Sequence, residues 1–266
     1  MKKKVIGFVH THWDREWYRE FEVFRMRLLR VFDNILGMLK SGKLPSFYFD
    51  GQTSALEDYL EMRPENTEIV KQLIKEKKLF IGPFYCLIDE FLTDENAIRK
   101  NLEIGLKYSQ NMGCKDFVGY FADTFGHTSN TIPILKEFGV DTVVVWRGGG
   151  EIPAEFTWQV NNSDDNSTSI NCINLVRGYF NDYLSSSLDI DKKTAGIKSE
   201  LDKIAKYSGN VLLMPIGGDH LGVHKDILSI VDEVNQRLDD YEIQIGSIFD
   251  YIKLVKDRFA NHKVVG

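Results

Sequence analysis

The chain has 266 residues, of which 43% are hydrophobic, and a formal net charge of −6. Its length allows one large α/β domain or two small ones, and an acidic chain without a basic stripe lacks the usual signature of a nucleic-acid-binding protein. The three cysteines are widely spaced and form no CxxC pair, which argues against a disulfide framework.

The N-terminus opens with lysines and one short apolar run. That run spans residues 5–9 and ends at His10, whereas a secretory signal needs about 7–15 apolar residues and a membrane span about 20. We therefore expect a cytoplasmic protein with no membrane partner, whose first residues already belong to the fold.

Short apolar runs rich in β-branched and aromatic residues predict buried strands. In chain order these strands are expected at residues 5–9, 46–49, 79–84, 117–121, 142–146 and 211–216. Amphipathic stretches predict helices at residues 20–39, 67–77, 95–112, 131–138, 195–207, 224–238 and 248–259. Residues 161–168 are rich in turn formers and predict a surface loop.

This alternation of strands and helices predicts a mostly parallel sheet with helices packed outside it. Such sheets carry their chemistry beyond the carboxyl ends of the strands. Polar residues follow every predicted strand, namely His10, His12, Asp14, Asp50, Asp89, Glu90, Asp123, Arg147, Asp219 and His220. Helix capping explains one or two of them, but the whole series indicates a functional edge of the sheet.

The first informative segment is His10-Thr11-His12-Trp13-Asp14-Arg15-Glu16-Trp17. In an extended strand, His10, His12 and Asp14 lie on the same face. Imidazole nitrogens and carboxylate oxygens suit zinc, so the segment predicts a metal site, with a hydrogen-bonded His–Asp pair as the alternative. We interpret His10 as a residue that orients a ligand.

Two further aspartates leave buried strands. Asp123 is a candidate metal ligand, nucleophile or both, with a turn-forming role as the alternative, and His127 is a candidate ligand or a hydrogen-bonding partner in the same loop. Asp219 follows Gly217 and Gly218, which allow a close approach of the backbone to a ligand; an ordinary Gly-Asp turn is the alternative.

Aromatic residues lie at the same strand ends. Trp13, Trp17, Phe125 and Trp146 are placed where the apolar face of a sugar ring can stack on them, and core packing is the alternative.

These segments together resemble glycoside hydrolase family 38, the α-mannosidases. The segment of residues 10–17 resembles the family's HxHxDxxW signature, and Phe121-Ala122-Asp123-Thr124-Phe125-Gly126-His127 resembles its nucleophile motif. Gly82-Pro83-Phe84-Tyr85 with Asp89-Glu90 resembles another segment of the same domain. Order and spacing agree across nearly the whole chain.

The resemblance implies that residues 1–266 form the family's N-terminal catalytic domain, a seven-stranded, barrel-like α/β domain with mostly parallel strands, outer helices and a zinc ion. By position, His12 and Asp14 match two zinc ligands. Asp123 matches the residue that is both zinc ligand and catalytic nucleophile. Asp219 matches the general acid/base, and Trp17, Phe125 and Arg147 match residues that contact the sugar or lie beside the nucleophile.

One departure from the family pattern concerns the zinc site. In the family, a further histidine from a region after this domain completes the ligand set, and family members are several times longer, with a helical bundle and β-rich domains downstream. Nothing in this chain matches that histidine. We therefore expect weak zinc binding and poor activity from the chain in isolation.

The expected function is zinc-dependent hydrolysis of α-mannosides, either small glycosides or short oligosaccharides, with retention through a covalent glycosyl-enzyme. One alternative is a metal-dependent carbohydrate deacetylase, which would release acetate instead of mannose. Another is a sugar-binding domain that is inactive through truncation. Arg15 is a candidate contact for an anionic aglycone or a salt-bridge partner of Glu16 or Glu20. The sequence leaves linkage preference and oligomeric state open.

Overall fold

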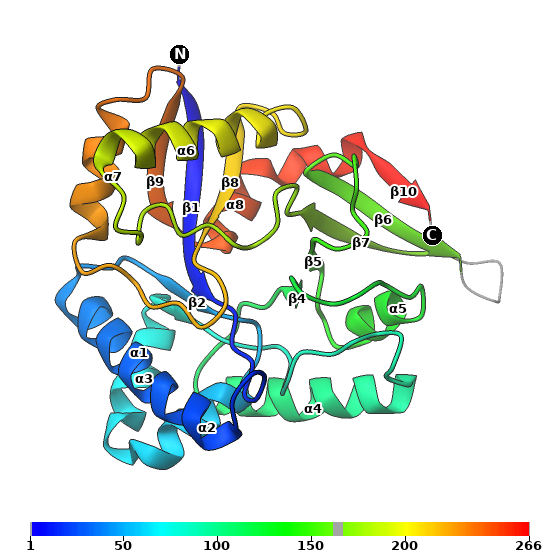
Figure 1. Cartoon of the computed structure of the whole chain (residues 1–266). Coiled ribbons are helices and arrows are strands. Elements are labelled where there is room, and N and C mark those ends of the chain that lie inside the picture. Colours follow the sequence, from blue (N-terminus) through cyan, green and yellow to red (C-terminus); the bar gives the residue numbers. More distant parts are fainter. Residues whose placement is uncertain (1, 162–166, 266) are drawn as a thin grey trace.

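The computed structural model describes residues 2–161 and 167–265, which form a mixed α/β domain (Figure 1). Its strands are β1 (Lys3–Thr11), β2 (Phe47–Phe49), β3 (Leu79–Phe80), β4 (Gly119–Phe121), β5 (Thr142–Val145), β6 (Glu155–Asn161), β7 (Ser167–Asn174), β8 (Val211–Ile216), β9 (Tyr241–Gly246) and β10 (Lys263–Val265). Its α-helices are α1 (Phe21–Ser41), α2 (Ser54–Met62), α3 (Thr67–Lys75), α4 (Glu95–Asn111), α5 (Thr131–Glu137), α6 (Ile190–Ile204), α7 (Ile227–Asn235) and α8 (Ile248–Val255). The 3₁₀ helices are η1 (Pro64–Asn66) and η2 (Lys256–Asn261).

The strands form two sheets. The first has the order β3-β2-β1-β8, with β9 also paired to β1, and the second has the order β10-β6-β7-β5-β4. The named pairs are parallel except for the antiparallel pair β6–β7. This arrangement confirms the prediction of a mixed α/β fold with mostly parallel strands. No strand of one sheet pairs with a strand of the other within the described ranges, so closure into a barrel stays a prediction.

The alternation of side chains along β1 divides the apolar residues between two cores. Val5 and Val9 pack in the core beneath helices α1, α2, α3, α6 and α7. Ile6 and Phe8 pack between the two sheets, with residues such as Tyr120 of β4. Because His10 and His12 continue the series of Ile6 and Phe8, their side chains point toward the interior between the sheets.

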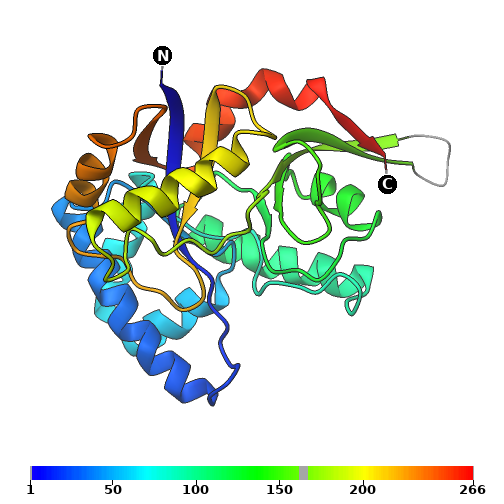
Figure 2. The same ribbon diagram turned by 45° about the horizontal axis from the view of Figure 1, so that its top comes forward.

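Most helices cover the outside of the sheets, as Figures 1 and 2 show for α6, which lies across β1 and β8, whereas α8 packs in the core that contains Ile6 and Phe8. Local signals set their ends. Asp94 accepts a hydrogen bond from the Ala97 N–H at the start of α4, and Ser247 and Asp250 form a capping box at the start of α8. Among the described residues, no helix combines the length and the apolar character that crossing a membrane requires.

All six predicted strands and all seven predicted helices are present, although several ends differ by a few residues. The prediction missed α2, the pair β6–β7, β9 and β10. Of the predicted surface loop at residues 161–168, residue 161 belongs to β6 and residues 167 and 168 belong to β7; residues 162–166 of that loop lie outside the described ranges. β9 has a clear period-2 burial pattern, which was a usable signal for a strand.

Candidate active site

The end of β1 brings two predicted site residues together through the backbone. The His12 N–H donates to the Gly218 carbonyl at 3.1 Å, and the His220 N–H donates to the His12 carbonyl at 2.8 Å. This isolated parallel bridge aligns His12 with Asp219 beyond the ends of β1 and β8. Residues that lie more than 200 positions apart in the chain therefore share one rim of the sheet.

Asp50, which follows β2, orients the His12 ring. Its Oδ1 lies 3.0 Å from His12 Nδ1, while its Oδ2 accepts hydrogen bonds from the Trp13 N–H and the Gln52 side chain, both at 2.8 Å. Asp50 is fully buried and has a φ of 55°, a left-handed conformation that is uncommon outside glycine. These contacts leave Nε2 of His12 as the nitrogen that faces the cleft.

The other two predicted metal ligands, Asp14 and Asp123, lie near that nitrogen. His12 Nε2 is 3.6 Å from Asp14 Oδ1 and 3.8 Å from Asp123 Oδ2. Across the described part of the chain, no group of three or more His, Cys, Asp or Glu side chains is already spaced as a metal-ligand cluster. The donor types nevertheless fit zinc, because one imidazole nitrogen faces two carboxylates and its second nitrogen is held by a third.

The carboxylates around His12 favour a positive charge at this place. Burial lowers the pKa of His12, but the carboxylates of Asp50 and Asp14 outweigh this effect and raise it to about 11. Burial likewise raises the pKa of Asp14, but hydrogen bonds with His12 and His220 outweigh it and hold that pKa well below its usual range. Either an imidazolium or a bound cation satisfies such a group of carboxylates.

Asp123 leaves β4 and meets Arg147, which follows β5. The Arg147 Nε donates to Asp123 Oδ1 at 2.8 Å, and Nη2 contacts the same oxygen. The guanidinium also lies 4.0 Å from the centre of the Phe125 ring and 4.5 Å from that of Trp146. Arg147 therefore orients the Asp123 carboxylate, while Asp123 Oδ2 stays turned toward His12.

Asp219 has a partner that the sequence analysis did not identify. Burial raises the pKa of Tyr179, and a hydrogen bond to Asp219 raises it further, so the Tyr179 hydroxyl stays protonated and donates to the Asp219 carboxylate. The glycines before Asp219 allow close packing of the chain, and their predicted approach to a ligand stays a prediction. A Cβ at Gly217 would lie 2.0 Å from the His10 carbonyl oxygen, and one at Gly218 would lie 2.3 Å from the Phe180 ring.

These side chains line one cleft with a volume of about 420 Å³. It contains every predicted catalytic, metal-binding and substrate-binding residue: His12, Asp14, Trp17, Asp123, Phe125, Arg147 and Asp219. Trp17 and Phe125 are 75% and 60% exposed, so they offer free ring faces at the cleft, whereas the candidate Trp13 is buried. The prediction missed Tyr179, which also lines the cleft; Asp89, predicted only as a polar residue after a strand and given no role, lines it as well.

The hydrogen bonds and ion pairs of His10, His127 and Arg15 decide three further predictions. His10 does not orient His12; its Nε2 donates to the Tyr179 carbonyl at 2.8 Å, and burial lowers its pKa to about 4, so the ring is neutral. His127 has both ring nitrogens engaged in hydrogen bonds, which leaves none for a metal. Arg15 forms a two-point ion pair with Asp58, at 2.6 and 2.8 Å, in place of one with Glu16 or Glu20.

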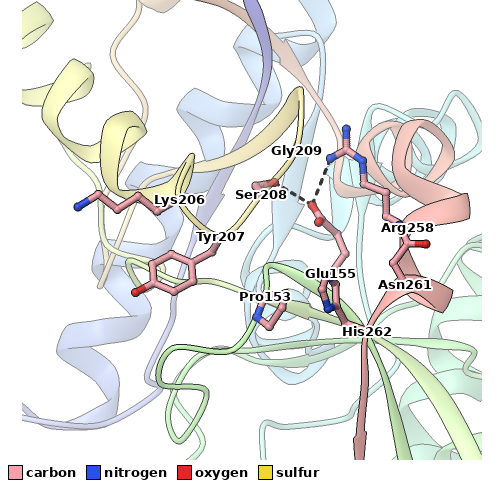
Figure 3. Close-up of a pocket in the computed structure, with 9 residues that line it drawn as sticks. All are labelled: Pro153, Glu155, Lys206, Tyr207, Ser208, Gly209, Arg258, Asn261 and His262. Atoms are coloured by element: carbon pink, nitrogen blue, oxygen red, sulfur yellow. Dashed lines mark hydrogen bonds and ion pairs between the residues drawn. The ribbon is translucent and has the colours of Figure 1, made fainter.

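A second cavity, of about 450 Å³, lies near the starts of β6, β8 and β10 (Figure 3). Its central carboxylate is Glu155, which is 4% exposed. The Ser208 hydroxyl donates to Glu155 Oε1 at 3.0 Å, Tyr251 contacts the same oxygen, and Arg258 Nη1 lies 3.7 Å from it. The charge of Glu155 is therefore compensated within the protein, as expected for a structural network rather than a reactive site.

Comparisons with known proteins point to one family. A family profile described as "Glycosyl hydrolases family 38 N-terminal domain" matches residues 2–265. A relative from Halalkalibacterium halodurans, described as "Putative mannosylglycerate hydrolase", is 32% identical, and the match covers 100% of this chain and 31% of that protein.

Two solved structures from Enterococcus faecalis are similar over the whole chain. The structure of an alpha-mannosidase from strain V583 has a TM-score of 0.89 at 33% identity, and 30% of that chain is covered. A protein in glycosyl hydrolase family 38 has a TM-score of 0.78 at 31% identity, and 29% of it is covered. The chain thus spans less than a third of the length of each of these relatives.

Proposed function

The chain belongs to glycosyl hydrolase family 38, whose N-terminal domain matches residues 2–265, and on this premise we propose that it carries the catalytic residues of a retaining α-mannosidase. The main support is the convergence of Asp123, Asp219 and His12 on one cleft from the ends of three different strands. The two aspartates are the carboxylate pair that glycoside hydrolysis requires.

Asp123 is the proposed nucleophile. Arg147 engages one oxygen of Asp123, which orients the carboxylate so that its other oxygen is turned toward His12 at the cleft. Attack forms a bond between an Asp123 oxygen and the anomeric carbon, and the bond from that carbon to the leaving oxygen breaks. Asp219 donates its proton to the leaving oxygen and later takes a proton from the water that releases the sugar.

Tyr179 is proposed to support Asp219. Its hydroxyl donates to the Asp219 carboxylate and holds that carboxylate in position at the cleft. Trp17 and Phe125 are the proposed platforms for the sugar, since both line the cleft with exposed rings.

His12, Asp14 and Asp123 are the proposed zinc ligands, with Asp50 holding the His12 ring in position. When bound there, zinc would supply Lewis acidity and a point of attachment for sugar hydroxyls. The further ligand that the family resemblance implies has no match in this chain, so the proposed site has three protein ligands here.

The proposed substrate is an α-mannoside with an uncharged aglycone. Four carboxylates line the cleft, from Asp14, Asp89, Asp123 and Asp219, whereas its one guanidinium is already paired with Asp123. A carboxylate on the aglycone would meet this excess of negative charge. The name of the Halalkalibacterium relative points to a mannoside of glycerate as the competing substrate.

Zinc content measured by elemental analysis tests the metal site. After incubation with zinc, we expect the wild-type chain to retain more of the metal than Asp14→Ala, and Asp239→Ala, which changes an exposed aspartate with no role in the cleft, to retain as much as the wild type. Equal zinc in the wild type and in Asp14→Ala would contradict the assignment of Asp14 as a ligand.

Proton NMR of the products tests the reaction. With methyl α-mannoside, we expect α-mannose to form first, as retention requires. β-Mannose as the first product would contradict retention, and acetate released from an N-acetylated sugar would identify a deacetylase instead. Faster hydrolysis of mannosylglycerate than of a neutral α-mannobiose would contradict the proposed aglycone.

A further inference from the structure

A buried carboxylate joins two loops that flank the cleft. Glu90 lies in the loop after β3 and is 4% exposed. Its Oε1 lies 2.8 Å from His127 Nδ1, and its Oε2 accepts hydrogen bonds from the Thr128 N–H at 2.9 Å and the Thr131 hydroxyl at 2.5 Å. One side chain thus anchors the loop that follows Asp123 at several points.

His127 extends this connection to a third strand. Its Nε2 lies 3.1 Å from the Arg147 carbonyl oxygen, beyond the end of β5. The two ring nitrogens thus lie against a carboxylate of one loop and a backbone carbonyl of another. The ring is enclosed by Phe121 and Trp158, at centroid distances of 5.9 and 5.7 Å, and Glu90 is the charged group that contacts it.

We propose that Glu90 and His127 are positioning residues that hold Arg147 against Asp123. Neither side chain lines the cleft, so their effect passes through the backbone of residue 147 and through the loop of residues 123–128. The Arg147 guanidinium lies between Asp123 and the Phe125 ring, and a shift of its backbone changes the orientation of both.

A second contact supports this coupling between the loops. The Thr124 hydroxyl donates to the Ile88 carbonyl at 2.9 Å, directly beside Asp123. The loop after β3 therefore holds the loop after β4 at both of its ends, through Ile88 and through Glu90. The displacement of a reacting group by about 1 Å lowers the rate by about 10²-fold. Contacts that hold the loop of Asp123 in place are therefore expected to affect kcat.

Glu155 offers a matched control. It has the same 4% exposure as Glu90 and is likewise hydrogen-bonded through its carboxylate, but it lines the second cavity near the strand starts and not the cleft (Figure 3). If Glu90 were only structural, Glu90→Gln and Glu155→Gln would have the same kinetic consequences. The proposal predicts that they differ.

The kinetic test rests on the proposed mannosidase function and uses the full chain with methyl α-mannoside. We expect Glu90→Gln to lower kcat by about 10²-fold with little change in KM, and Glu155→Gln to leave both unchanged. Thr131→Val, which removes one donor to Glu90 and keeps the shape of the side chain, should lower kcat by about tenfold. Equal kcat losses in the two glutamine variants, or none in Glu90→Gln, would overturn the proposal.

A test that needs no activity is NMR of the histidine rings. We expect the ring N–H signals of His127 to exchange slowly in the wild type and in Glu155→Gln, and to lose that protection in Glu90→Gln and partly in Thr131→Val. Rapid exchange of the His127 ring N–H signals in the wild type overturns the positioning role. If the wild-type chain shows these signals but hydrolyses no mannoside, the proposed function fails and the positioning network stands.

Discussion

The cleft and the second cavity have similar volumes, about 420 and 450 Å³, but opposite electrostatic organisation. In the second cavity, Glu155 is compensated by hydroxyl groups and a guanidinium. In the cleft, Asp89 and Asp219 form no ion pair with any described residue, and His12 is surrounded by more carboxylates than it can neutralise. The difference separates carboxylates that stabilise the fold from carboxylates that are available to a ligand.

The largest expected effect is on Asp123. Asp123→Asn should lower hydrolysis of methyl α-mannoside by on the order of 10³-fold or more, because the amide is a poor nucleophile. The melting temperature should change little, since Asp123 lies at the cleft. Full activity in this variant would remove the main distinction between the cleft and the second cavity.

Glu155 should show the reverse behaviour. Glu155→Ala leaves Arg258, Tyr251 and Ser208 without their shared acceptor, so we expect a loss of about 3–5 kcal/mol in the free energy of unfolding. Urea unfolding followed by circular dichroism measures this loss, with the exposed Glu151→Ala as the control. Under conditions in which the variant is folded, kcat should equal that of the wild type; a lower kcat would indicate that the second cavity takes part in the reaction.

A smaller effect is expected from Tyr179→Phe, which removes the donor to Asp219. A hydrogen bond to a charged group contributes about 1.5–3 kcal/mol, so kcat/KM should fall by about 10- to 100-fold. Tyr183→Phe, a change of the same kind in a half-buried tyrosine outside the cleft, is the matched control. Equal rates in the two variants would show that Tyr179 only packs against its neighbours.

The smallest effect is expected from Lys206→Ala at the rim of the second cavity. Lys206 is exposed and forms no ion pair with the described residues, so the free energy of unfolding should change by less than about 0.5 kcal/mol. Thermal unfolding and hydrolysis rates both check this. A clear loss of activity would mean that the second cavity binds something the reaction needs.

Patterns within short segments were sufficient for much of the fold. The strands around Val5–Val9 and Val211–Ile216 were predicted because buried parallel strands are continuous apolar runs, and the long helices because their apolar residues recur with a helical period. The pair β6–β7 was missed because the apolar residues of these strands alternate with polar ones and form no continuous apolar run. The two strands are also antiparallel, in a sheet that was expected to be parallel.

The sequence by itself determined which residues follow the strands, and together with the family resemblance this was enough to select His12, Asp14, Asp123, Arg147 and Asp219. Only the tertiary structure decided how they are held. Asp50 reaches His12 across 38 residues of chain, and Glu90 reaches His127 across 37. No local pattern records such pairings, because they arise when the ends of separate strands meet at one edge of a sheet, where burial makes each polar group find a partner.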